Sequence, residues 1–145
     1  MKALIQRVKD ASVTIEGDLY SKIGRGILIF LGVEKSDEIE NADKLAQKVL
    51  NLRIFEDEND KMNLSVSDVN GEILVVSQFT LCGDCKKGTR PSFDNAAKPD
   101  KAVKLYEDFV NFLKLSGLIV QTGKFRAMMD VSLVNDGPVT FMIEK

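Results

Sequence analysis

Polar side chains that could take part in chemistry follow an apolar segment near the middle of the chain. Ser77, Gln78 and Thr80 come directly after the run "EILVV" at residues 72–76, with Phe79 between them. A threonine hydroxyl acts as a nucleophile only beside a general base, and the 145-residue chain contains no histidine. Ser-His and Cys-His nucleophile pairs are therefore excluded. These polar groups either hydrogen-bond to a neighbouring turn or bind a ligand, and both interpretations stay open.

Two cysteines, Cys82 and Cys85, have the spacing of a metal-binding or redox pair. A zinc site needs about four ligands, and without histidine only carboxylates could complete this one. We therefore expect two free thiols in a loop and no metal or cofactor. A small thiol-based metal or redox protein remains the alternative. Because Lys86 and Lys87 follow the pair, a lowered pKa of the Cys85 thiol is a further hypothesis.

Basic residues gather in the segment "KKGTRPSF" at residues 86–93, which carries Lys86, Lys87 and Arg90. The formal net charge of the chain is −2, so any contact with nucleic acid must come from such a local patch. The polar stretch 82–98 is predicted to be a long ordered loop, and loops of that length are usually functional. The alternative to phosphate binding is an ordinary solvated surface.

Gly137 and Pro138 stand together in "NDGPVT", residues 135–140, between two predicted strands at about 128–134 and 139–144. This dipeptide is common in turns. A cis peptide bond before Pro138 would aim successive carbonyl oxygens to the same side. Glycine has no Cβ, so its backbone can approach a ligand closely. We therefore expect a turn whose main chain contacts a ligand.

The remaining patterns predict one α+β domain over residues 1–145. Strands are expected at 2–8, 12–16, 23–33, 70–81 and about 118–123, because these segments alternate or are apolar throughout. A helix is expected at about 37–50, capped by Asp37 and with Ile39 in its apolar stripe, and another from Pro99 to Gly117. Two main helices and grouped strands indicate a mostly antiparallel or mixed, barrel-like β-sheet. With no membrane-spanning run and no secretory signal, a cytoplasmic location is expected.

Several motifs, taken in order, resemble one known family. These are "KALIQRVKDASVTIEG" at the start, then "VSQFTL", "KGTRPSF" and "QTGKF", and finally "VSLVNDGPVTF". The chain resembles the D-aminoacyl-tRNA deacylases, also called D-tyrosyl-tRNA deacylases, over its whole length. The resemblance implies a homodimer that hydrolyses the ester between a D-amino acid and the 3′-terminal adenosine of tRNA. Only the cysteine pair departs from the family's expected pattern.

The resemblance also implies roles for particular residues. The segment Ser77–Thr80 would form the catalytic site, and Gly137 with Pro138 would reach into the other subunit's active site and reject L-amino acids. The resemblance implies that Arg7 helps hold the Gly-Pro turn, and Asn135 is expected to support it as well. It also implies adenosine contacts at Phe125 and Met129. The basic residues Lys86, Lys87 and Arg90 are expected to contact the tRNA.

A mechanism without histidine fits this family. An aminoacyl ester is activated, and the neighbouring ribose 2′-hydroxyl can assist attack on its carbonyl. The protein then has to position the ester and supply donors to the oxyanion, and we expect these to be the main-chain N–H groups of Phe79 and Thr80. Glycine has no side chain to clash, so glycyl-tRNA is expected to be cleaved as well. The rival from another class is a non-catalytic RNA-end-binding domain.

Overall fold

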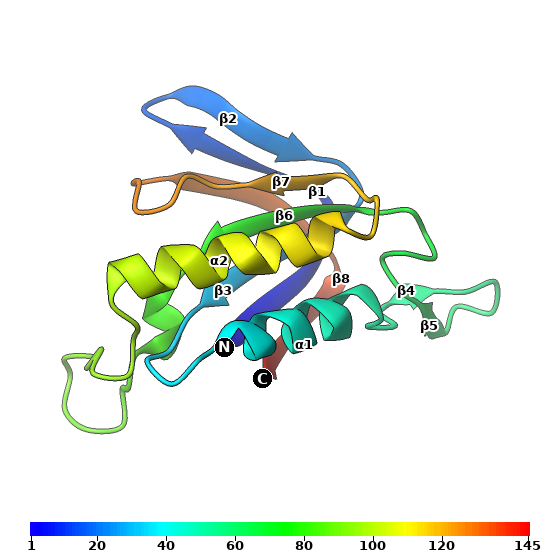
Figure 1. Cartoon of the computed structure of the whole chain (residues 1–145). Coiled ribbons are helices and arrows are strands. Elements are labelled where there is room, and N and C mark those ends of the chain that lie inside the picture. Colours follow the sequence, from blue (N-terminus) through cyan, green and yellow to red (C-terminus); the bar gives the residue numbers. More distant parts are fainter.

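Two helices lie side by side over one face of a twisted β-sheet (Figure 1) in a computed structural model that describes residues 1–145. The helices are α1 (Ile39–Leu50) and α2 (Pro99–Lys114). The main sheet contains β1 (Lys2–Ile15), β2 (Asp18–Ile23), β3 (Gly26–Gly32), β6 (Glu72–Ser77), β7 (Val120–Thr122) and β8 (Asp130–Glu144). A separate small hairpin is formed by β4 (Phe55–Glu56) and β5 (Met62–Leu64).

The main sheet is mixed, as predicted. Its strand order is β2-β1-β3-β6-β7, and β8 adds to β1. The long strand β1 pairs antiparallel with β2, β3 and β8, whereas β3 with β6 and β6 with β7 are parallel. The sheet curves into a nearly closed, barrel-like layer. The predicted α+β class with two main helices is confirmed.

The sheet is buried on both faces at its centre. Ile27, Ile29 and Leu31 of β3 join the large core beneath the helices, while Leu28 between them joins a second core of 7 buried residues. Alternate residues of a strand point to opposite faces, so a strand buried on both sides must be apolar throughout. This explains the apolar run at 26–32. The predicted strand at 23–33 is too long, because Ile23 ends β2 and β3 begins at Gly26.

The predicted N-terminus of the first helix is wrong by two residues. Helix α1 begins at Ile39, and Glu38 caps it in a reciprocal pair with Asn41. Asp37 is instead buried, where its carboxylate accepts hydrogen bonds from the Met1 ammonium and the Glu34 N–H, both at 2.6 Å. A buried charge needs a charged partner. Asp37 therefore pairs with the Met1 ammonium, and Glu38 is the N-cap in its place. Ile39 is 46% exposed and is not part of the core stripe.

The predicted strand at 70–81 is too long at both ends. Strand β6 stops at Ser77, and Phe79–Cys82 form the short 3₁₀ helix η1. The neighbouring strand β3 ends at Gly32, and the last paired residues are Leu31 and Ser77. Beyond that point a strand would find no ladder partner for its backbone groups. The second helix begins at Pro99 as predicted, but it ends at Lys114 rather than at Gly117.

The predicted pair of C-terminal strands is one strand. Strand β8 runs from Asp130 to Glu144 and pairs with β1 on both sides of the Gly-Pro pair. Val8 pairs with Asn135 and Gln6 with Thr140, so two steps along β1 face five steps along β8. The extra residues form a bulge. The chain does not reverse at Gly137, because the same strand β1 continues to offer partners beyond it.

The segment between η1 and α2 has no helix or strand and carries only two isolated bridges, Asp84 to Ser92 and Ala96 to Glu34. The predicted long loop is therefore present. Neither helix has the length and the apolar character that crossing a membrane requires.

Candidate active site

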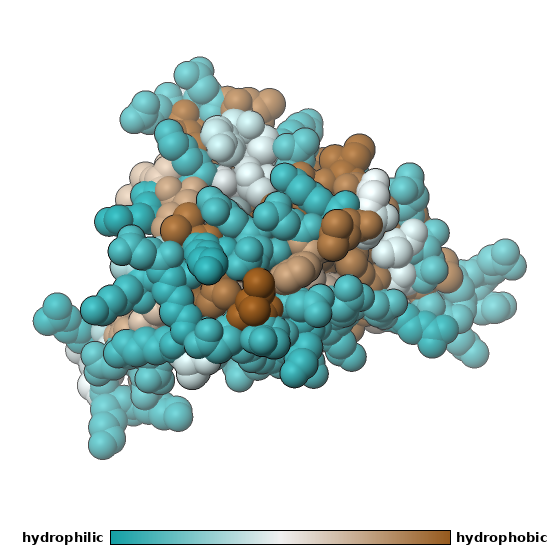
Figure 2. All heavy atoms as spheres, in the orientation of Figure 1, coloured by the Kyte–Doolittle hydropathy of each residue, from teal (hydrophilic) through white to brown (hydrophobic).

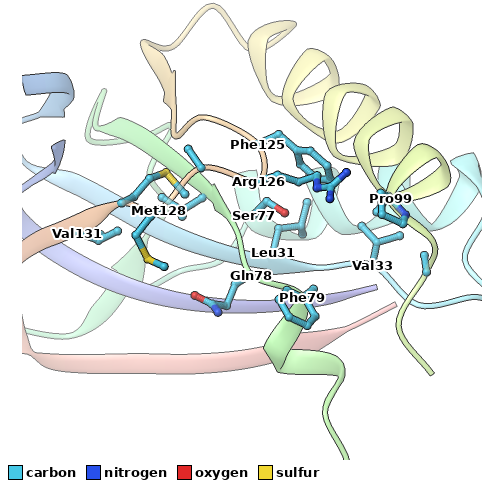
Figure 3. Close-up of a pocket in the computed structure, with 15 residues that line it drawn as sticks. Leu31, Val33, Ser77, Gln78, Phe79, Pro99, Phe125, Arg126, Met128 and Val131 are labelled. Atoms are coloured by element: carbon cyan, nitrogen blue, oxygen red, sulfur yellow. The ribbon is translucent and has the colours of Figure 1, made fainter. Parts of the chain in front are cut away.

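A cavity of about 630 Å³ opens where β6 ends and α2 begins (Figure 3). Its lining is mainly apolar, with 11 hydrophobic residues among 15. A pocket of this size and character is typical of a small-ligand site. The walls come from the end of β3, the end of β6, the start of α2 and the segment between β7 and β8: Leu31, Val33, Val76–Phe79, Ala97, Pro99, Ala102, Phe125–Met129 and Val131.

The polar side of the cavity is the end of β6. Figure 3 shows Ser77, Gln78 and Phe79 following one another along one wall, with Phe125 and Arg126 across from them. The N–H of Gln78 still donates to the Leu31 carbonyl at 2.8 Å. Its side-chain amide donates to the Thr80 hydroxyl. Thr80 itself does not line the cavity, so its hydroxyl contacts the site through Gln78.

The first N–H groups of η1 have no partner inside the protein. The first donors of any helical turn lack an acceptor within the turn, and the N–H groups of Phe79 and Thr80 donate to no other atom of the chain. Phe79 lines the cavity, and Thr80 follows it directly in the chain. Two adjacent free backbone donors at the edge of an apolar cavity can bind a carbonyl oxygen or an oxyanion.

Phe125 is held in place by Tyr106 of α2. The two ring centroids are 5.9 Å apart, with the planes at 45°. The Tyr106 hydroxyl donates to the Val75 carbonyl at 2.8 Å, which fixes the ring against β6. Burial raises the pKa of this phenol well above its ordinary value. Tyr106 is a supporting residue that the sequence shows only as one member of the apolar stripe of a helix.

Met129 and Arg126 also line the cavity. The Met129 sulfur lies so close to Gly123 that a Cβ on this glycine would be 2.9 Å from it. The phenyl ring of Phe125 and the thioether of Met129 thus give the cavity an apolar side suited to a flat base. Arg126 has a φ of 62°, a backbone conformation uncommon for residues other than glycine. No sequence signal indicated Arg126.

The Gly-Pro pair lies outside this cavity. The peptide bond between Gly137 and Pro138 is cis, and both residues are exposed in the bulge of β8. Gly137 has a φ of 140°, and a Cβ there would be 2.9 Å from the Val139 nitrogen. Glycine is therefore required by the local backbone.

The side chains of Arg7 and Asn135 stabilise the bulge through hydrogen bonds to its backbone and to Thr140. The Arg7 guanidinium is buried and donates to the carbonyls of Asp136 at 2.9 Å and Ile54 at 2.7 Å. It also contacts the Glu56 carboxylate at 3.4 Å. The Asn135 side chain accepts from the Val139 N–H at 2.9 Å and donates to the Thr140 hydroxyl. Arg7 bonds to the backbone just before the Gly-Pro pair, and Asn135 bonds to the backbone just after it.

The basic loop lies next to the cavity but does not line it. Lys86, Lys87 and Arg90 are exposed, and the loop is fastened to the site by Phe93, whose ring centroid is 5.0 Å from that of Phe79. Gly83 permits this contact, because a Cβ there would be 3.0 Å from the Phe93 ring.

The two cysteines differ in environment. Cys82 is buried, its thiol donates to the Val33 carbonyl, and burial raises its pKa, whereas Cys85 is exposed. Both thiols are free. No group of three His, Cys, Asp or Glu side chains is placed to hold a metal ion.

Comparison with known proteins gives one consistent result. Residues 4–144 match the family model described as D-Tyr-tRNA(Tyr) deacylase. The chain is 59% identical to a D-aminoacyl-tRNA deacylase of Thermodesulfovibrio yellowstonii, over 99% of this chain and 98% of that protein. It is also 59% identical to a D-aminoacyl-tRNA deacylase of Thermosipho africanus, over 99% of this chain and 97% of that one.

Two solved structures share the fold. One, titled c-Myc DNA Unwinding Element Binding Protein, has a TM-score of 0.94 and 44% identity, and covers 100% of this chain and 99% of that chain. The other is titled as a probable eukaryotic D-amino acid tRNA deacylase. It has a TM-score of 0.85 at 19% identity, covers 99% of this chain and 98% of that chain, and supports the fold alone.

Proposed function

The chain belongs to the D-Tyr-tRNA(Tyr) deacylase family, and from that premise we propose how it recognises D-aminoacyl-tRNA and rejects the L form. It is a hydrolase that acts on the ester bond of D-aminoacyl-tRNA. The observation that carries the proposal is the cavity, which the polar side chains of Ser77 and Gln78 line together with the apolar side chains of Phe125 and Met129.

The terminal adenosine and the aminoacyl ester occupy opposite walls of this cavity. The adenine packs against Phe125 and Met129, whose ring and thioether offer flat apolar surface. The ester carbonyl then lies at the end of β6, beside Ser77 and Gln78. Lys86, Lys87 and Arg90 lie on the neighbouring loop and neutralise phosphates farther along the tRNA.

Hydrolysis relies on backbone donors and on the substrate's own hydroxyl. The free N–H groups of Phe79 and Thr80 stabilise the oxyanion that forms when the ester carbonyl is attacked. The ribose 2′-hydroxyl beside the ester assists the attack. The Thr80 hydroxyl supports the geometry through its bond with Gln78. No protein side chain has to act as a nucleophile, which agrees with a chain that lacks histidine.

Rejection of L-amino acids is assigned to the backbone at Gly137 and Pro138 of a second copy of the chain. These residues are exposed on β8, away from the cavity of their own chain, and so are available to a twofold partner. If their carbonyl oxygens face the substrate's α-carbon, the D form presents hydrogen and the L form presents its side chain. Main chain cannot move aside as a rotamer can, so the L form is excluded.

The same steric argument extends the substrate range. A D side chain points away from the carbonyls, so its identity matters little. Glycine presents hydrogen in both directions, and we therefore include glycyl-tRNA among the substrates. Residues 1–145 act as one deacylase domain, and an enzyme that edits aminoacyl-tRNA works in the cytoplasm, where the charged tRNA is used.

The test is hydrolysis of matched D-tyrosyl-tRNA, L-tyrosyl-tRNA and glycyl-tRNA by the purified protein. We expect the D and glycyl esters to be cleaved and the L ester to survive. Resistance of glycyl-tRNA alone would refute the steric account, while leaving the deacylase assignment in place.

A binding-only protein would give a different result. One structural relative is titled as a binding protein of a DNA element, and a non-catalytic module would bind the tRNA end without releasing amino acid.

Replacing both Cys82 and Cys85 by serine should leave deacylation unchanged, because neither thiol lines the cavity. Loss of activity in a folded Cys82→Ser/Cys85→Ser variant would favour the thiol-based alternative.

A further inference from the structure

A second cavity, of about 350 Å³, adjoins the first at Phe125, which lines both. Its walls come from three elements that are distant in the sequence: Tyr20 of β2, Asn111 and Lys114 of α2, and Lys124 just after β7. In Figure 1, β7 runs between α2 and β2, with α2 on one side of it and β2 on the other. Of the residues discussed above for the candidate active site, only Phe125, Tyr106 and Gly123 belong to the second cavity.

The segment after β7 divides its side chains between the two cavities. Lys124 lines the second cavity, Arg126 lines the first, and Phe125 lies at the boundary between them. A chain of nucleotides that crosses this boundary would therefore pass between two cations. Phosphates are spaced along such a chain at every nucleotide, so alternating aromatic and cationic contacts suit it.

The charge of the second cavity favours an anion. Lys114 and Lys124 are both exposed, and neither forms an ion pair with a carboxylate of the chain. Glu107 also lines the cavity and offsets one of the two positive charges. The Asn111 amide adds a donor for a hydroxyl or phosphate oxygen. Figure 2 shows mostly hydrophilic atoms along α2, with apolar atoms beside its C-terminal end, where Leu115 and Ile119 are exposed.

An aromatic ring is also available for a base. Tyr20 is 50% exposed although it is a large, partly apolar side chain. Stacking on an exposed aromatic ring, combined with nearby cations, is the general means by which proteins bind single-stranded nucleic acid without reading its sequence.

We propose that the second cavity binds the nucleotide that precedes the terminal adenosine, with its phosphate between Lys114 and Lys124 and its base against Tyr20. This inference rests on the proposed function, because it places the terminal adenosine in the first cavity. It assigns to Lys114, Lys124 and Tyr20 a role in binding the end of the tRNA strand, and to Phe125 the position between two successive nucleotides.

The test compares two substrates that differ only in the preceding nucleotides. D-tyrosyl-tRNA contains them, and D-tyrosyl-adenosine, the same ester on adenosine alone, does not. The readout is the ratio of kcat/KM for the first substrate to kcat/KM for the second. In the Lys114→Gln/Lys124→Gln variant we expect this ratio to fall about tenfold at moderate salt, because the phosphate loses both of its cationic partners. The slope of log kcat/KM for the tRNA against log salt should become shallower by about 0.7, because one phosphate loses its cationic partners.

A matched control removes the same charge elsewhere. Lys44 and Lys48 are exposed on α1 and line neither cavity, so Lys44→Gln/Lys48→Gln should keep the wild-type ratio. A Tyr20→Ser variant should lower the ratio as well, without changing the salt slope. If the wild type cleaves both substrates and the Lys114→Gln/Lys124→Gln ratio is unchanged, this inference is wrong and the proposed function stands. If the wild type cleaves neither substrate, both fail together.

Discussion

At the scale of single residues, Arg7 connects three parts of the chain that are far apart in the sequence. Arg7 is a residue of β1, and its guanidinium donates to the carbonyls of Ile54 and of Asp136 in the bulge of β8. It also contacts the Glu56 carboxylate in the β4–β5 hairpin. Arginine can do this because its planar group carries several donors in fixed directions. Lysine has one nitrogen and cannot reach two carbonyls on different sides.

The first prediction concerns this residue. Arg7→Lys should lower the free energy of unfolding by about 2–3 kcal/mol, because at least one buried carbonyl loses its partner while a charge stays buried. Urea denaturation measures the change. Lys9→Gln, which alters an exposed charge on the same strand, should leave the midpoint almost unchanged. An Arg7→Lys midpoint equal to that of the wild type would mean that the contacts to Ile54 and Asp136 contribute little.

The second prediction uses the raised pKa of Tyr106. The ordinary pKa of this phenol is 10.0, and burial raises it in the folded state. Above pH 10 the unfolded chain loses the proton while the folded chain keeps it, so Tyr106 makes stability fall as pH rises, by at most about 1.4 kcal/mol per pH unit. Below pH 10 the phenol is protonated in both states and this loss is absent.

Tyr106→Phe removes the titrating group and the hydrogen bond to Val75 but keeps the ring against Phe125. At pH 7 the variant should be less stable by about 1 kcal/mol. Between pH 10 and pH 11 the difference should shrink or reverse, because only the wild type is penalised. Unfolding curves at several pH values test this, and a difference that stays constant up to pH 11 would contradict it. Deacylation at pH 7 should be nearly normal, since Phe125 keeps its neighbour.

At the scale of elements, the approach of β3 to β6 places the polar wall of the cavity. The two strands run parallel from the pair Gly26–Glu72 to the pair Leu31–Ser77. Gly26 lies so close to β6 that a Cβ would be 1.8 Å from the Glu72 carbonyl oxygen. The spacing at this end of the ladder therefore depends on glycine.

The third prediction follows from that contact. Gly26→Ala must move β3 away from β6, and we expect a loss of about 3 kcal/mol or more in the free energy of unfolding. Gly24→Ala is the matched control, because a Cβ there meets only the end of the Glu72 side chain at 3.8 Å. Urea unfolding of both variants decides the matter. Equal stability of the two would show that β6 shifts without cost.

At the scale of the whole molecule, β8 leaves one edge of the sheet open. It pairs with β1 along one side only, and three large apolar side chains on it, Val134, Phe141 and Met142, are each at least 40% exposed. An exposed edge strand with apolar side chains is suited to a twofold partner. The Gly-Pro bulge lies on this same strand, next to any partner that covers it.

The fourth prediction tests whether active sites are shared between subunits. Gly137→Ala and Phe125→Ala should each inactivate the protein, the first by disturbing the bulge and the second by removing a cavity wall. If each site takes Gly137 from one subunit and Phe125 from the other, co-refolding the two variants restores about a quarter of the wild-type rate, because about half of the dimers are mixed and one of their two sites is intact. If co-refolding restores no measurable activity, Gly137 and Phe125 of each site come from the same subunit.

The sequence by itself determined the local and compositional features of this protein. The apolar run at 23–33 predicted a strand buried on both faces, because alternation disappears when both sides of a strand are covered. The segment 70–81 predicted a second buried strand, of which residues 72–77 form β6. Pro99 marked the start of α2, because proline fits a first helical turn. The missing histidine excluded the common nucleophile pairs, because that limit depends on residue types alone.

Only the tertiary structure decided which distant groups meet. In the folded chain Asp37 pairs with the buried Met1 ammonium and does not cap the helix. Strand β6 ends where β3 ends, and β8 continues past Gly137 as one strand paired with β1. It also brought Tyr106 against Phe125 and placed Lys114 and Lys124 around a common cavity. These contacts join residues far apart in the chain, and local propensity carries no information about them because they form only when the elements pack.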